Sequence, residues 1–185
     1  AANFEQAKAL IDRGVEADGS RPTGTAYLLS TSDTARNVRS TSYPLVRKLL
    51  KGRLQVSELK QDALRDAGDV FLYFIGARRV EGLDSLRFVP GAIADHLTSF
   101  GGALTSDSQM SALRWLEAGA TGSYGTVAEP CNFPQKFPDP VLVSHYYLRG
   151  ETLIEAYWKS VLMPGQGIFI GEPLAAPFSR QQAAR

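Results

Sequence analysis

The chain has 185 residues, of which 44% are hydrophobic and 21% are charged, and its formal net charge is +1. This length fits a single domain. The nearly neutral charge argues against non-specific electrostatic binding to nucleic acid or to an anionic membrane. No apolar run approaches the roughly 20 residues that a membrane-spanning helix needs. A single cysteine excludes an intramolecular disulfide, so cysteine usage assigns no cellular compartment.

The first half of the chain alternates predicted helices and strands. Asn3 is a good N-cap for a helix over residues 4–17, and a dense apolar strand follows at residues 25–30. A helix over residues 43–50, an alternating strand at 54–59 and a short helix over 62–67 come next. The strand at residues 70–75, VFLYFI, is the most hydrophobic and should lie at the centre of the sheet.

The second half continues the alternation and predicts the fold class. We expect a short strand from residue 88 that gives way to a polar loop at Asp95, a helix from 110 to the stop signal at Gly119, and a strand at 120–127. A proline-rich loop, helices over 141–148 and 151–163, and a last strand at 167–171 complete the chain. The pattern predicts an α/β three-layer sandwich with a mostly parallel sheet of about six strands. We expect the chain to form one domain over residues 1–178, followed by a polar tail at residues 179–185.

Polar residues follow two of the predicted strands, and the topology should bring them together. In a parallel βαβ unit both strands end at the same edge of the sheet, which is where ligands bind. The polar residues that follow these two strands are therefore expected to form a candidate site, and they are Asp95, His96, Ser99, Glu129 and Cys131.

The chain resembles the caspase-like (caspase–gingipain–CHAT) fold over nearly its whole length. The segments that carry this resemblance are the strand into Gly76, the loop at 88–102, LEAGATGS at 116–123, YLRGETLIEA at 147–156 and FIGEP at 169–173. At a closer level, four motifs are similar to a bacterial family found in species that carry the exosortase protein-sorting system. These motifs are GAIADHLTSFGG, GATGSYGTVAEPC, GETLIEAYWKSV and GIFIGEPLAAPF.

The family resemblance also carries an expectation about location. Members of that bacterial family are longer at the N-terminus, and this chain begins at Ala1 without an initiator Met. That start fits either cleavage after a small residue or a fragment boundary. Together these points favour a processed or truncated chain that acts in the periplasm or outside the cell.

The chain departs from the caspase-like pattern at both catalytic positions. Where the peptidases carry His-Gly after the third strand, this sequence has Gly76-Ala77-Arg78. Where they carry the nucleophilic cysteine, it has the segment from Ala92 to Asp95. The resemblance therefore implies a catalytically degenerate domain that works by binding or assembly. We expect a protein or peptide partner, with a second copy of the chain among the candidates, and no cofactor and no nucleic acid.

The alternative is a cysteine-dependent or metal-assisted hydrolase whose site has moved to the C-terminal edge of the sheet. Cys131 could act as the nucleophile if His96 lies within hydrogen-bond distance, with Asp95 and Ser99 beside them. A lone cysteine is more often a small buried hydrophobe, however. A metal site at Asp95, His96 and Glu129 is disfavoured because adjacent strand residues point to opposite faces, so no metal is predicted.

Four arginines follow the first and third strands and suggest an anionic ligand. Guanidinium groups bind carboxylates and phosphates in bidentate fashion, so a peptide carboxylate or an acidic side chain would fit. The arginines are Arg36, Arg39, Arg78 and Arg79, with Glu129 as a further ligand-binding candidate. The other interpretation, equally open at this point, is that they form salt bridges with Asp33, Asp84, Asp95 or Glu129. The loop at residues 130–140, rich in proline and aromatic residues, is the second candidate contact surface.

Overall fold

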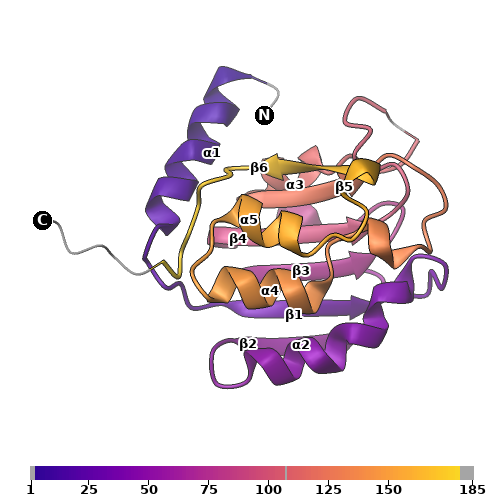
Figure 1. Ribbon diagram of the computed structural model, residues 1–185, viewed down its shortest axis with the longest axis horizontal. Coiled ribbons are helices and arrows are strands. Elements are labelled where there is room, and N and C mark those ends of the chain that lie inside the picture. Colours follow the sequence, from indigo (N-terminus) through magenta and orange to yellow (C-terminus); the bar gives the residue numbers. More distant parts are fainter. Residues whose placement is uncertain (1–2, 107, 180–185) are drawn as a thin grey trace, which may run out of the picture.

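The computed structural model describes residues 3–106 and 108–179. These residues form a six-stranded sheet with helices against both faces, which confirms the predicted α/β three-layer sandwich (Figure 1). The predicted polar tail at 179–185 lies outside the described residues except for Ser179. None of the helices in the described part of the chain is long and apolar enough to cross a membrane.

The sheet has the strand order β2-β1-β3-β4-β5-β6. The first five strands run parallel to their neighbours, and only β6 is antiparallel, against β5. The strands are β1 (Thr25–Ser30), β2 (Gln55–Lys60), β3 (Val70–Gly76), β4 (Phe88–Leu97), β5 (Gly122–Thr126) and β6 (Gly167–Gly171). Because β1 to β5 are parallel, the loops that follow them all emerge at one edge of the sheet.

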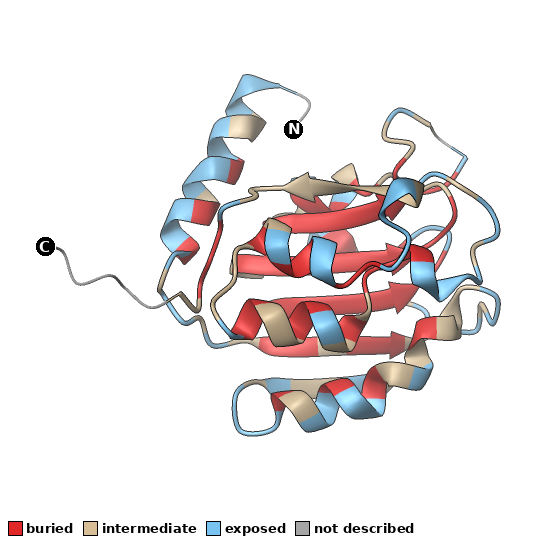
Figure 2. Ribbon diagram, in the orientation of Figure 1, coloured by how far each residue is buried: buried red, intermediate tan, exposed pale blue. Residues whose placement is uncertain are grey.

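Three helices cover one face of the sheet, the face toward the viewer in Figure 1. They are α2 (Tyr43–Leu50), α4 (Pro140–Leu148) and α5 (Leu153–Lys159). Two buried tyrosines tie these helices to the strands, since Tyr43 Oη donates to the Phe74 carbonyl at 3.1 Å and Tyr147 Oη to the Gly91 carbonyl at 2.8 Å. Strand β3 is buried along its whole length (Figure 2), which confirms its predicted central position.

The opposite face is covered by α3 (Leu113–Ala118), and α1 (Phe4–Ala17) lies beside that helix. Trp115 of α3 is fully buried, and its ring contacts that of Tyr73 edge to face with the centroids 5.1 Å apart. Helix α1 begins at the predicted N-cap, where the Asn3 side chain accepts a hydrogen bond from the Gln6 amide at 2.9 Å. Arg13 of α1 donates to the Leu116 carbonyl of α3 at 3.1 Å, which joins the two helices.

Several boundaries differ from the prediction, and one of them decides the candidate site. Residues 62–67 do not form a helix, and Asp66 adopts a left-handed φ of 55° that a helix cannot contain. Helix α5 ends at Lys159 rather than at residue 163. Strand β4 continues to Leu97, so the expected polar loop at Asp95 is wrong. The strand continues because β3 pairs with it over this whole stretch, which buries Asp95 and His96 between the helical layers.

Candidate functional site

Loops that are far apart in the sequence meet at the carboxyl edge of the sheet. Ser99 follows β4, and its Oγ donates a 2.6 Å hydrogen bond to Oε2 of Glu129, which follows β5. Arg36, in the loop after β1, donates from Nε to Thr98 Oγ1 at 3.0 Å. The loops after β1, β4 and β5 are therefore in contact, and we call this group the carboxyl rim. The structure thus brings together Ser99, Glu129 and Arg36, as the parallel topology requires.

Cys131 belongs to the same rim, where its thiol faces a backbone carbonyl group and not His96. Its Sγ lies 3.9 Å from the Ala35 carbonyl oxygen, and the side chain is half-buried. Nearby, the buried Lys136 donates from Nζ to the Ala128 carbonyl. Burial lowers the pKa of Lys136, while the charges of Glu129 and Cys131 act in the opposite direction. The lysine therefore anchors the loop that follows β5.

The floor of the carboxyl rim is held by a side-chain network. Gln109 Oε1 accepts hydrogen bonds from Thr98 Oγ1 at 2.6 Å and from the Phe100 amide at 2.8 Å. Thr126 Oγ1 lies 2.9 Å from both the Thr98 and the Ser99 carbonyl oxygens. Ser99 is fully buried by these contacts. Its hydroxyl is therefore a bracing group, with no exposed surface for a substrate to reach.

Backbone packing under the rim requires glycine, which yields a stability prediction. A Cβ added at Gly125 would overlap the backbone of Gly101 and Gly102. Gly125→Ala is therefore expected to lower the free energy of unfolding by about 1–3 kcal/mol, because the two loops must separate. Gly68→Ala is the matched control, since nothing lies within 4 Å of its added Cβ, and its change should stay within about 0.5 kcal/mol. Urea unfolding of both variants measures the difference, and equal stabilities would contradict the close packing.

His96 is a structural residue on the face covered by α3. Trp115 Nε1 donates to His96 Nδ1 at 2.9 Å, so Nδ1 is unprotonated and the proton sits on Nε2, which lies 2.9 Å from the Met110 carbonyl oxygen. Burial lowers the pKa of His96 to about 4, since the charged form would be desolvated. Both ring nitrogens are occupied, so the hypothesis of a His96–Cys131 dyad is wrong in its geometry.

Asp95 faces the other way, toward α5. In the sheet it pairs with Phe74, whereas His96 pairs with Ile75, and successive residues alternate between faces. Its Oδ1 accepts from the Tyr124 amide at 2.8 Å and lies 3.4 Å from Tyr157 Oη, while its Oδ2 has no hydrogen-bond partner. Burial raises the pKa of Asp95 to about 6, partly offset by the positive charge of Arg39.

The separation of these two side chains also bears on the metal hypothesis. Asp95 and His96 lie on opposite faces of β4, and Glu129 bonds to Ser99 on the rim. Within residues 3–106 and 108–179, no group of three or more His, Cys, Asp or Glu side chains is close enough to hold a metal ion.

The four arginines do not converge on one ligand. Arg36 is paired with Asp33 at 2.8 Å, which is the salt bridge expected as the alternative. Arg78 donates from Nε and Nη2 to the Ser108 carbonyl, at 3.0 and 2.7 Å. Arg79 lines a separate surface hollow of about 460 Å³. Of the two interpretations left open, a single shared ligand does not fit, because Arg36 turns toward Asp33 and Thr98 whereas Arg78 turns toward Ser108.

Arg39 stands apart because it is buried. It lies in the 3-10 helix η1 (Asn37–Ser42), and only 5% of its surface is exposed. Its guanidinium carbon is 5.7 Å from the centroids of both the Phe74 and the Phe137 ring. It donates to two backbone carbonyl oxygens, of Pro138 at 3.2 Å and of Asp95 at 3.5 Å, and its Nε has no partner. No described residue places a carboxylate within ion-pair distance of this charge.

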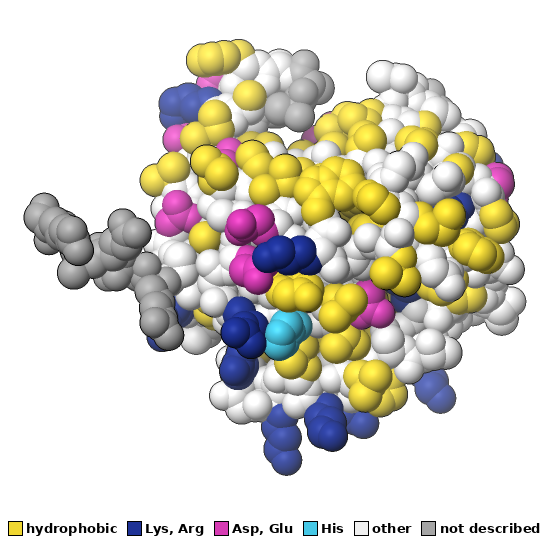
Figure 3. Space-filling model, in the orientation of Figure 1, with side chains coloured by type: hydrophobic (Ala, Val, Ile, Leu, Met, Phe, Trp, Pro, Cys, Tyr) yellow, Lys and Arg dark blue, Asp and Glu magenta, His cyan; other side chains and the backbone are white. Residues whose placement is uncertain are grey.

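A hollow of about 270 Å³ lies over Arg39, between η1, the segment 134–140 and the end of α5. We call it the Arg39 hollow. Its wall includes Phe137, Leu142 and Leu162, and Leu162 is 76% exposed. Hydrophobic side chains gather on this face over α5 and β6 and toward the carboxyl edge (Figure 3). The arrangement is a buried cation beneath a mixed wall, in which polar residues lie beside the apolar ones. Among them is Asp139, whose Oδ1 accepts hydrogen bonds from the Val141 and Leu142 amides at the start of α4.

Comparisons of this chain with protein-family models, with curated proteins and with solved structures found no match. The geometry of the chain therefore carries the functional argument.

The residues that organise the site but were not singled out from the sequence are Trp115, Gln109 and Lys136. Trp115 was expected as a helix residue, yet its indole nitrogen sets the protonation of His96. Lys136 could have been found from the sequence, because it lies in a loop that contains four prolines. Proline has no backbone N–H, so such a loop has few backbone donors and its carbonyl groups need side-chain donors such as a lysine. Gln109 could not have been found from the sequence in this way. Its partners, Thr98 and Phe100, directly follow β4, so their positions depend on where that strand ends.

Proposed function

We propose that this chain is a catalytically inactive caspase-like domain that binds a protein or peptide partner through an acidic group placed in the Arg39 hollow. The proposal places this activity in the cell envelope or outside the cell. The caspase-like identity and the location rest on the sequence resemblance alone, whereas the binding role rests on the side chains described above.

The burial of Arg39 without a carboxylate partner is the observation that carries this proposal. A buried charge is costly unless it is paired, and its unpartnered Nε adds a further cost. Proteins tolerate such a cost where a ligand completes the pairing. The charge of Asp95 acts on Arg39 only from beyond ion-pair distance. An incoming carboxylate would add the direct ion pair that no described residue supplies, and Arg39 lines an open hollow through which it could arrive.

The shape of the hollow favours a single side chain or a chain terminus. Its volume of about 270 Å³ falls below the range of about 300–1,000 Å³ typical of sites for drug-sized molecules. Phe137, Leu142 and Leu162 offer apolar surface to the residues that flank the acidic group. A partner segment with a carboxylate next to leucine-like side chains matches both parts of the site.

The same geometry counts against the relocated hydrolase. A cysteine or serine nucleophile needs a base within hydrogen-bond distance. His96 has both ring nitrogens engaged, and Ser99 is fully buried against Glu129. Peptide or ester hydrolysis that disappears in Cys131→Ala would contradict the binding proposal.

The test is a binding titration with a defined acidic peptide. A fluorescein-labelled Leu-Leu-Glu with a free C-terminus should bind, and its amidated Leu-Leu-Gln counterpart should not. Arg39→Met keeps the apolar stem between the two phenylalanine rings but removes the charge, so the dissociation constant should rise at least about tenfold. Fluorescence anisotropy measures both constants.

The control for this titration is another arginine of the same group. Arg78→Met removes a guanidinium whose hydrogen bonds to described residues go to the exposed Ser108 carbonyl, so peptide affinity should not change. Arg39→Lys keeps the charge without the planar fork and should give an intermediate affinity. Circular dichroism establishes that the variants fold. Equal binding of the acidic and amidated peptides, or no binding of either, would overturn the proposal.

A further inference from the structure

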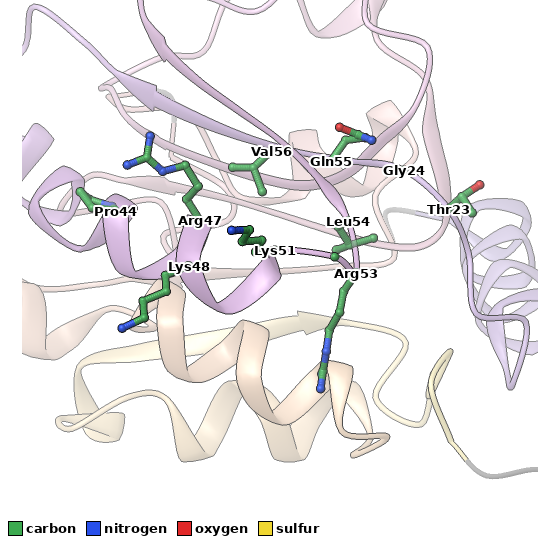
Figure 4. Close-up of a pocket in the computed structure, with 11 residues that line it drawn as sticks. Thr23, Gly24, Pro44, Arg47, Lys48, Lys51, Arg53, Leu54, Gln55 and Val56 are labelled. Carbon is green, nitrogen blue, oxygen red and sulfur yellow. The ribbon is translucent and has the colours of Figure 1, made fainter.

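A second basic surface lies around the turn that joins α2 to β2, the outermost strand of the sheet. It is a hollow of about 910 Å³, and it shares no lining residue with the Arg39 hollow. Four cationic side chains line it, from α2 and from the turn that follows: Arg47, Lys48, Lys51 and Arg53 (Figure 4). Apolar surface from Leu54 and Val56 lies between them. We call this surface the basic groove.

The charges of the basic groove are largely uncompensated. No acidic residue lines the hollow. Arg47 reaches Glu58 at 3.7 Å, and the other three cations have no hydrogen bond or ion pair to any residue that the structure describes. Arg47 and Lys48 lie in the last turn of α2, where positive charge stabilises a helix. That effect does not explain Lys51 and Arg53, which come after the helix and widen the positive surface.

The groove adjoins a free sheet edge. Strand β2 is the outermost strand of the sheet, so on one side it has no neighbouring strand among residues 3–106 and 108–179. It pairs with β1 in six consecutive register positions without a bulge, and it contains no proline. Alternate residues of β2 therefore turn their amide and carbonyl groups outward, as a template for another strand. Gln55 and Val56, the first residues of β2, themselves line the groove.

From these features we infer that the basic groove binds an extended acidic segment of a partner protein, which adds as a strand to the free edge of β2. Main-chain hydrogen bonds to β2 supply affinity, and alternate side chains supply specificity. Carboxylates on one side of the added strand meet Lys48, Lys51 and Arg53. Because the side chains of a strand alternate, the apolar side chains between these carboxylates point to the opposite face of the sheet.

The test uses a labelled Glu-Val-Glu-Val-Glu-Val peptide titrated into the wild-type protein. The double variant Lys51→Glu/Arg53→Glu should weaken binding at least about tenfold, because like charges then face each other. Arg65→Glu/Arg149→Glu is the matched control, since it changes the net charge equally at exposed positions outside the groove. The control should bind as the wild type does. Circular dichroism confirms that both double variants are folded.

A peptide with N-methyl groups on alternate amides separates strand addition from simple attraction. N-methylation removes the backbone donors on one side of the peptide, so the version blocked on the pairing side should bind at least about tenfold more weakly. Equal affinity for all N-methylated versions would overturn strand addition. Binding of phosphatidylserine vesicles or of an oligonucleotide through Lys51 and Arg53, without binding of the acidic peptide, would also overturn the inference. Arg39 is not changed in these experiments. A result that contradicts strand addition at the basic groove therefore does not contradict binding at the Arg39 hollow.

Discussion

His96→Ala is expected to lower the free energy of unfolding at pH 7 by about 3–5 kcal/mol. The change leaves a cavity at a fully buried position and removes the acceptor of the Trp115 indole and the donor to the Met110 carbonyl. Each unpaired buried group costs about 1–3 kcal/mol, and the cavity adds to this. Urea unfolding followed by the fluorescence of the two tryptophans, Trp115 and Trp158, measures the effect.

His145→Ala is the matched control, because it replaces the other histidine of the chain. His145 is half-buried at the end of α4 and makes a ring contact with Tyr146. Its loss should cost no more than about 1 kcal/mol. If the His96→Ala protein is as stable as the wild type, the imidazole is not a structural group. A catalytic role for His96 would then have to be tested again.

Asp95→Asn is expected to change the pH dependence of stability by about 3 kcal/mol between pH 7 and pH 4. The pKa of Asp95 is raised by burial from 3.8 to about 6 in the folded protein. The folded state therefore binds more protons than the unfolded state in this range. The stability that the protonated carboxyl contributes is present below pH 3.8 and is lost as the pH rises through 6, with a shift of about two pKa units worth roughly 3 kcal/mol.

The neighbouring His96 has the opposite dependence. Its pKa is lowered from 6.5 to about 4, so the unfolded state binds more protons and stability falls as the pH drops through this window. In the wild type the two contributions nearly cancel between pH 6.5 and pH 4. Asp95→Asn removes one of them and leaves the loss caused by His96, so the variant becomes acid-sensitive relative to the wild type.

The measurement is the difference in unfolding free energy between Asp95→Asn and the wild type across this pH range. Hydrogen bonds lost in the variant lower its unfolding free energy by the same amount at every pH. They therefore do not affect how the difference between variant and wild type changes with pH. Asp12→Asn, which replaces an exposed carboxylate on α1, is the surface control, and its effect on stability at pH 7 should stay within about 0.5 kcal/mol. A difference for Asp95→Asn that does not vary with pH would mean that its carboxyl is solvated rather than buried.

Part of the candidate site could be predicted because it follows from topology. Parallel strands end at one edge, so Ser99 and Glu129 had to come close, although 30 residues separate them. The orientation of Asp95 and His96 also follows from strand geometry, but only once β4 is known to continue to Leu97. The polar sequence suggested a loop at that point, because buried polar residues are uncommon and their partners lie elsewhere in the chain.

The sequence by itself determined the number, type and order of most elements, including the exact bounds of α1, β1, α2 and β6. Those features depend on local periodicity, caps and turn residues, which are written in consecutive positions. Only the tertiary structure decided the environments of His96, Asp95 and Arg39. Their roles depend on partners such as Trp115, Tyr124 and Phe137, which are 19 to 98 residues away in the chain and become neighbours only through packing.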